Sequence, residues 1–122
     1  MCSTVYLPKT NKYNYPRQWN LNDLWRLSSN LQVNTINVNT LWNQRYAKAW
    51  CWQQEDEELN NEFFLHHMQR ITNANLDYPI ILSEENYILD GVHRLMKCKY
   101  LNIQDIKYVQ FTKDPTCYSE TK

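Results

Sequence analysis

The chain has 122 residues, of which 43% are hydrophobic and 21% charged, enough to build one domain around a single core. Its 13 basic and 13 acidic residues cancel, with no long run of either sign, so nothing suggests a broad electrostatic surface for duplex DNA or an anionic membrane. Residues 1–122 are therefore predicted to form one domain, and any affinity for anions must be local.

The N-terminal segment and the cysteines predict a soluble, cytoplasmic protein that does not enter a membrane. Residues 1–9 lack the charged and then apolar pattern of a signal peptide, and the apolar runs are only a few residues long. The four cysteines lie far apart and form no Cys-x-x-Cys pair, which argues against a zinc knuckle or a disulfide scaffold. We expect reduced thiols.

The first half of the chain is rich in aromatic residues. The elements that we expect there, in chain order, are a short strand at 5–7, a polar loop, a helix from Asn20 or Asn22 to about Gln32, and an extended segment at 33–38. The stretch 41–52 gives no clear assignment. We interpret Trp19, Trp25, Trp42, Trp50 and Trp52 as core and rim packing, with base stacking or protein binding as the alternative.

A second helix is predicted from about Asp56 to Asn73, because three acidic residues suit its positive end. At about 100° per residue, one arc of this helix holds Leu59, Phe63, Phe64 and Ile71, with His67 in its middle. We therefore expect His67 to face inward as a hydrogen-bonded core residue. Metal chelation by the adjacent pair His66 and His67 is disfavoured, because neighbouring helical side chains diverge.

The last third predicts a hairpin, a helix and a final strand. The strands at 79–82 and 87–89 are mostly apolar, a helix follows to about 101–102, and 106–111 forms the last strand. The predicted fold class is α+β, a mixed sheet of about four short strands with three or so helices.

Gly91 is the only glycine of the chain, and it lies between the second hairpin strand and the following helix. Glycine adopts positive φ and lets other groups approach the backbone closely. Around that helix, His93, Arg94 and Lys97 cluster on the side opposite to the apolar residues. Free N–H groups, the helix dipole and these cations together favour a phosphate or carboxylate.

Each residue of this segment also has an ordinary structural interpretation. Asp90 is most simply an N-cap of the helix, and Arg94 can form an internal ion pair with it one turn away. His93 can be a surface imidazole and Lys97 a solvated helix residue. For Arg94 we favour ligand binding, because its planar fork suits phosphate and carboxylate groups.

The stretches Tyr78–Leu82 and Ile88–Leu95, with Lys97, Ile106 and Phe111 beyond them, resemble the ParB/sulfiredoxin-like superfamily. The signature of that superfamily is a strand followed by a Gly-x-[His/Arg]-Arg turn that opens a helix. More narrowly, the chain is similar to short, stand-alone ParB-like proteins whose preceding helix carries a histidine and an arginine, here His67 and Arg70. The resemblance covers residues 67–115.

This resemblance implies a small α+β domain in which the turn cradles nucleotide phosphates, such as those of ATP or CTP with Mg²⁺. Two departures from the pattern of the superfamily narrow the set of activities that we expect. Val92 stands where sulfiredoxin has its reactive cysteine, so that repair chemistry is not expected. His93 replaces one arginine of the partitioning proteins, and no helix-turn-helix module follows, so specific DNA binding is not expected.

The leading hypothesis is a nucleotide or phosphometabolite site that supports phosphoryl transfer or nucleotide hydrolysis, as in a phosphotransferase or nucleotide hydrolase. Its phosphate-binding residues are Gly91, Val92, His93, Arg94 and Lys97, and His67 and Arg70 are expected in the pocket wall. Asp90 and His93 are the candidate catalytic residues, Asp90 as a Mg²⁺ holder and His93 as a proton shuttle. Candidate proton acceptors are Asp77, Glu84 and Glu85.

Two further function classes stay open. The first is a non-catalytic module that senses a ligand, or that binds a protein partner or a second copy of itself through its tryptophan-rich half. The second is a metal-dependent nuclease, although the sequence groups no set of carboxylates for the metal. Whether the protein is an enzyme is therefore left undecided by the sequence.

Overall fold

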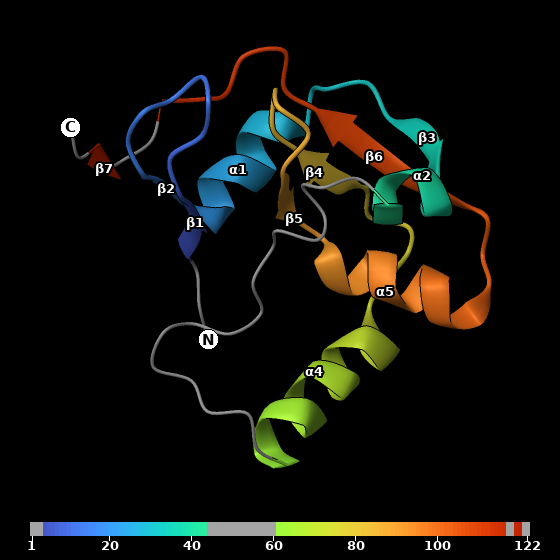
Figure 1. The fold of residues 1–122 in the computed structure, drawn as a ribbon. Helices are drawn as coiled ribbons and strands as arrows, with labels where there is room; N and C mark the ends of the chain where they lie inside the picture. The colour runs from blue at the N-terminus through green and yellow to red at the C-terminus, as the bar shows by residue number, and fades with distance from the viewer. Residues whose placement is uncertain (1–3, 44–60, 117–118, 121–122) are drawn as a thin grey trace.

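A computed structural model describes residues 4–43, 61–116 and 119–120 of the chain (Figure 1). The elements follow one another in this order: β1 (Thr4–Leu7), β2 (Arg17–Asn20), α1 (Leu21–Ser28), β3 (Asn34–Asn37), α2 (Val38–Asn43), α4 (Asn61–Asn73), β4 (Ile80–Leu82), β5 (Ile88–Asp90), α5 (Val92–Leu101), β6 (Asp105–Gln110) and β7 (Ser119–Glu120). In the described ranges, no helix is both long enough and apolar enough to cross a membrane.

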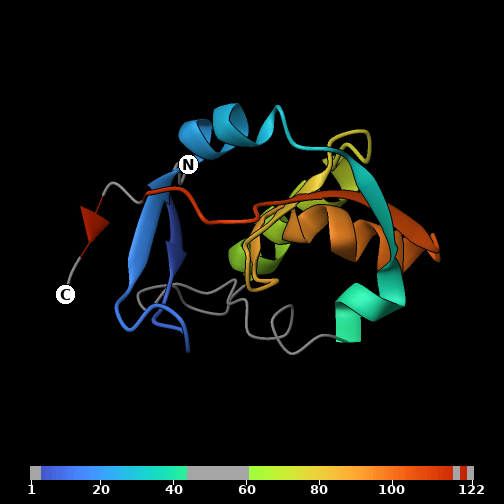
Figure 2. The ribbon, with the colours of Figure 1, turned by 90° about the horizontal axis from the view of Figure 1, so that it is seen from above.

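The strands form two separate sheets. The larger sheet has the order β3-β6-β4-β5, in which β4 runs parallel to β6 and the two outer pairs are antiparallel. The smaller sheet is antiparallel and has the order β1-β2-β7. Figure 2 shows the β1–β2 hairpin beside the larger sheet, and Leu7 and Trp19 of the hairpin share an apolar cluster with Ile81 and Leu89 of that sheet. The predicted α+β class with a mixed four-stranded sheet is confirmed.

Strands β4 and β5 of the larger sheet are covered on both faces, and successive side chains of a strand point to opposite sides. Ile80 and Leu82 of β4 join one apolar cluster with Leu95 of α5. Ile81, between them, joins a second cluster on the other face with Leu24 of α1. A short run of three apolar residues therefore serves two cores, which explains why β4 is fully buried.

The predicted helix ends are confirmed where a local signal sets them. Asn20 caps α1, and its Oδ1 accepts a hydrogen bond from the backbone N–H of Asn22 at 2.9 Å. Helix α5 ends at Leu101, and its C-cap Asn102 adopts φ 57° and closes the last turn. The prediction that α1 extends to Gln32 is wrong, because the Ser28 and Ser29 hydroxyls bond to backbone carbonyls one turn back.

Other expectations of the sequence are corrected. The predicted polar loop contains strand β2, whose Trp19 is buried, and the predicted extended segment turns into α2 at Val38. Phe64 was expected on the buried arc of α4, yet its side chain is 50% exposed. The predicted helix start at Asp56, together with Leu59, Trp50 and Trp52, lies outside the described residues.

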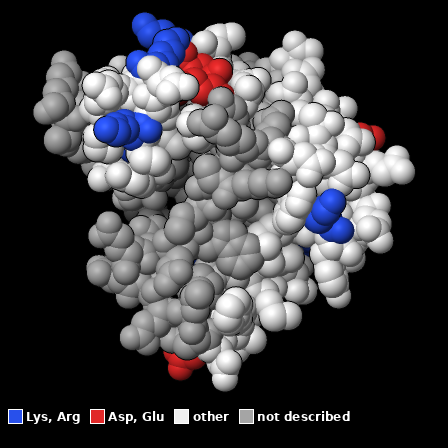
Figure 3. Space-filling view, in the orientation of Figure 1, with Lys and Arg blue, Asp and Glu red and all other residues white. Residues whose placement is uncertain are grey.

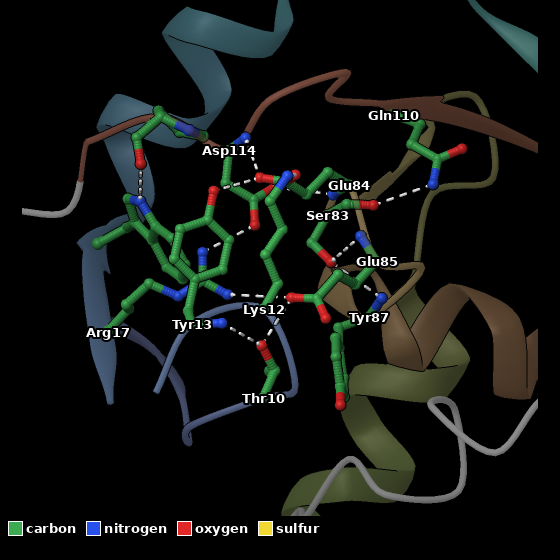
Figure 4. Close-up of polar contacts among 12 residues, drawn as sticks. Thr10, Lys12, Tyr13, Arg17, Ser83, Glu84, Glu85, Tyr87, Gln110 and Asp114 are labelled. Carbon is green, nitrogen blue, oxygen red and sulfur yellow. Dashed lines mark hydrogen bonds and ion pairs between the residues drawn. The ribbon is translucent and has the colours of Figure 1, made fainter. Parts of the chain in front are cut away.

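A polar network joins the loop between β1 and β2 to the turn between β4 and β5 (Figure 4). Arg17 is 2% exposed, its guanidinium carbon lies 3.7 Å from the centre of the Tyr13 ring, and its Nη1 donates to Asp114 at 2.9 Å. The Tyr13 hydroxyl donates to Glu84, which also pairs with Lys12. The network connects the smaller sheet to the body of the protein.

Candidate functional site

The turn between β5 and α5 has the geometry that its glycine predicts. Gly91 is the N-cap of α5 with φ 108°, a left-handed conformation, and no side chain caps the helix start. A Cβ placed on Gly91 would lie 3.0 Å from Ile80 Cγ1 and 3.2 Å from Ile80 Cα. Glycine is therefore required both by the backbone conformation and by the close passage of β4.

Beside this turn lies a cavity of about 320 Å³. Its wall is formed by the start of α5 and the end of α4 with the residues that follow it, namely Arg70, Asn73, Ala74, Asn75, Asp90, Gly91, His93 and Arg94. The structure thus brings together five of the residues predicted for the site: Asp90, Gly91, His93, Arg94 and Arg70. No side chain caps the start of α5, and Gly91 and His93 of this turn line the cavity.

Asp90 does not cap α5, so its interpretation as an N-cap is wrong. Its Oδ2 accepts a hydrogen bond from Trp25 Nε1 at 2.9 Å and lies 3.6 Å from Arg94 Nη1. The expected ion pair one helical turn away is therefore present. Trp25 reaches Asp90 from α1, 65 positions away along the chain, which no local pattern predicts.

Arg94 lies between the sheet and the cavity. Its Nη1 donates to the backbone oxygen of Pro79 at 3.1 Å, just before β4 begins, and it also faces Asp90. These contacts hold one edge of the guanidinium. Arg94 is half-buried, so the rest of the fork can contact a ligand in the cavity it lines.

Lys97, predicted as a phosphate ligand, contacts protein groups in this structure. Its Nζ donates to the backbone oxygens of Thr72 at 2.9 Å and Ala74 at 2.8 Å, at the C-terminal end of α4. A cation at that end of a helix is favourable, because the last carbonyls carry partial negative charge. Lys97 therefore fixes the end of α4, and with it the opposite wall of the cavity.

His67 and His93 lie against each other at the inner side of the site. His67 is 7% exposed, as expected for a core residue, and its Nδ1 lies 2.9 Å from His93 Nε2. Burial, the neighbouring His67 and the charge of Arg70 lower the pKa of His93 to about 4. His93 is therefore neutral at pH 7 and can donate one hydrogen bond or accept one.

Arg70 is the most available cation of the cavity wall. It is exposed, and its guanidinium has no hydrogen-bond or ion-pair partner among the described residues. Asn73, on the same helix, and Asn75, just after it, line the cavity as well, and neither was predicted. In the sequence, only their position close to Arg70 links these two asparagines to the site. That proximity alone does not distinguish them from the other asparagines of the chain.

The remaining predicted residues lie elsewhere. Val92 is buried in the core, so only its backbone belongs to the turn. Glu84 and Glu85, named as proton acceptors, belong to the network around Arg17 and Tyr13. Asp77 is exposed, and its backbone N–H donates to Asn75 Oδ1 at 2.9 Å.

The charges of the described residues are local. Within those residues, no three His, Cys, Asp or Glu side chains gather as metal ligands. On the face drawn in Figure 3, the described Lys and Arg side chains form no continuous basic surface. On that face, the described residues therefore provide no extended basic surface for a polyanion.

No protein-family model, curated protein or solved structure shows a significant match to this chain. The resemblance to the ParB/sulfiredoxin-like superfamily stays a prediction.

Proposed function

We propose that this chain is a short ParB-like protein that binds a nucleotide or another small phosphorylated molecule beside Gly91. The observation that carries the proposal is the shared wall of the cavity. Arg70, Arg94 and the uncapped start of α5 all line the same 320 Å³. Phosphate oxygens are bound by such helix starts and by arginine forks.

Phosphoryl transfer or hydrolysis is the chemistry that we propose for this site if it is catalytic. A neutral His93 can accept a proton, and Arg70 and Arg94 can neutralise developing phosphate charge. Asp90 would be the carboxylate closest to the phosphate, and it is oriented by the Trp25 N–H. For a protein with such a ligand and such chemistry, we propose a cytoplasmic location.

The alternative is a sensor that binds the ligand without turnover. One observation favours it: the Asp90 carboxylate already interacts with Trp25 and Arg94. These contacts reduce its ability to accept a proton or to hold Mg²⁺. Product analysis with any ligand that binds distinguishes the enzyme from the sensor.

The test of binding is a thermal-shift and calorimetric panel of inorganic phosphate, ATP, ADP, CTP and GTP, each with and without Mg²⁺. A ligand at 100 times its Kd stabilises the fold by about 2.7 kcal/mol. Arg70→Gln is expected to weaken binding by roughly 10- to 100-fold, since a hydrogen bond to a charged group is worth about 1.5–3 kcal/mol.

Arg26→Gln is the matched control, because Arg26 is an exposed arginine of α1 that pairs only with Asp23 among the described residues. It is expected to leave affinity unchanged. A panel without any stabilising ligand, or equal affinities for wild type and Arg70→Gln, contradicts the proposal. Cleavage of single-stranded DNA with Mn²⁺, lost in Asp90→Ala, would instead support the nuclease hypothesis.

A further inference from the structure

The charges around the cavity match one phosphate group. Arg70 and Arg94 carry two positive charges and Asp90 carries one negative charge, which leaves one net positive charge in the wall. His93 adds none at pH 7, because its pKa is about 4. The start of α5 contributes roughly half a positive charge.

Lys97 adds only about half a positive charge to this balance. Its ammonium group contacts the carbonyl oxygens of Thr72 and Ala74, at a helix end that carries roughly half a negative charge. A single phosphate group carries about 1.5 to 2 negative charges at pH 7. The wall compensates that charge, whereas a triphosphate carries roughly twice as much.

The lining of the cavity also contains uncharged polar side chains. Asn73 makes no side-chain hydrogen bond with any described residue, and it lines the cavity beside Arg70. An amide offers both donors and an acceptor, which is the complement of a hydroxyl group. Asn75 is anchored through its Oδ1, which accepts from the Asp77 N–H, so its NH₂ group is held in place.

The volume of the cavity is compatible with a small ligand. At about 320 Å³ the cavity lies at the lower end of small-molecule sites, which span roughly 300–1,000 Å³. Its lining combines the cationic side chains of Arg70 and Arg94 with the amides of Asn73 and Asn75. A ligand that contacts both kinds of side chain carries an anion together with groups that hydrogen-bond to amides, such as hydroxyls.

We infer that the natural ligand is a monophosphorylated polyhydroxy compound of about the size of a sugar phosphate, rather than a nucleoside triphosphate. The phosphate would lie between Arg70 and Arg94 at the start of α5, and hydroxyl groups would contact Asn73 and Asn75. This inference rests on the proposed function, since it names the ligand class of the same site.

The test compares four probes by calorimetry: ribose 5-phosphate, inorganic phosphate, ribose, and ATP with and without Mg²⁺. Ribose 5-phosphate is expected to bind at least 10-fold tighter than inorganic phosphate and at least 10-fold tighter than ATP. Ribose alone is expected to bind too weakly to measure, because it lacks the anion.

Asn73→Ala is the diagnostic variant, and Asn30→Ala is its matched control, since both asparagines are exposed but Asn30 lies outside the cavity. Asn73→Ala should abolish the 10-fold advantage of ribose 5-phosphate over inorganic phosphate while leaving the Kd for phosphate unchanged. Asn30→Ala should change neither.

The outcomes separate this inference from the proposed function. If ATP binds as tightly as ribose 5-phosphate or tighter, or if ribose 5-phosphate gains nothing over inorganic phosphate, the inferred ligand class is wrong while the phosphate site stands. If Asn73→Ala keeps the full advantage, the amides of the cavity do not recognise the hydroxyls. If no phosphorylated probe binds, the proposed function itself fails.

Discussion

The imidazole rings of His67 and His93 meet across two helices, with His67 Nδ1 and His93 Nε2 only 2.9 Å apart. The rings are stacked, with centroids 5.1 Å apart. One nitrogen of this pair must donate and the other accept, so the contact requires that at least one ring is neutral. The pair therefore links α4 to α5 through a hydrogen bond that is sensitive to protonation.

Acidification is expected to destabilise the fold through His93. Its pKa is lowered from 6.5 to about 4 by burial, His67 and Arg70, with Arg94 acting in the same direction and Asp90 opposing them. The unfolded chain binds this proton near pH 6.5 and the folded chain only near pH 4, so stability falls as the pH falls through that interval. After allowance for partial exposure, we expect a loss of about 1 kcal/mol between pH 7 and pH 5.

Urea unfolding at pH 7, 6 and 5 measures this loss. His93→Gln should flatten the dependence in that range. His66→Gln, which changes an exposed histidine of α4, should leave the dependence as in the wild type. A wild-type stability that does not change from pH 7 to pH 5 would show that His93 is not held neutral by the fold.

Gly91→Ala is expected to destabilise the protein by about 1–3 kcal/mol, because the residue has φ 108° and its new Cβ would contact the backbone of Ile80. Chemical denaturation gives the change directly. Asn102 is the C-cap at the other end of α5 and has φ 57°. Because glycine is favoured at such a position, Asn102→Gly should leave the stability of the protein unchanged or increase it. Equal stability of Gly91→Ala and wild type would mean that the turn adopts another conformation.

Arg94 and Arg70 should differ in their effect on stability although both line the cavity. Arg94→Gln removes the hydrogen bond to the Pro79 oxygen and the contact with Asp90, at an expected cost of about 1–2 kcal/mol. Arg70→Gln should stay within about 0.5 kcal/mol of wild type, because the side chain is exposed and has no partner among the described residues. Thermal unfolding of the two variants checks this, and equal losses would contradict the assigned contacts.

The contact between Tyr13 and Glu84 should appear as a coupling energy. The hydrogen bond to Glu84 raises the pKa of Tyr13 to about 12. Burial raises the pKa of Glu84, but the Asp114 N–H, Lys12 and Tyr13 outweigh it and lower that pKa to about 2. A double-mutant cycle of Tyr13→Phe and Glu84→Gln should give a coupling of about 1 kcal/mol or more.

Tyr6→Phe is the control for this cycle, since Tyr6 is 55% exposed on β1 and should not couple to Glu84. The stability that Glu84 contributes should be present above pH 4.5 and be lost as the pH falls towards 2, below the range in which His93 acts. A coupling near zero would mean that the two side chains do not meet in solution.

Several elements of this protein follow from short-range patterns in its sequence. The apolar residues of 80–82 predict a buried strand, Asn20 predicts the start of a helix, and the single glycine predicts a turn with positive φ. Each of these signals acts within a few residues, through sterics or a local hydrogen bond, so it can be read without the fold. His67 belongs here too, because the helical period places it inward.

The partners of the charged side chains were decided only by the tertiary structure. Lys97 contacts the end of α4, Asp90 accepts from Trp25, and Glu84 lies with Tyr13 rather than at the cavity. Asn73 and Asn75 became cavity residues because α4 ends against the start of α5. Long side chains choose among partners that packing brings within a few ångströms, and those partners lie 23 to 71 positions away along the chain, beyond the reach of any local pattern.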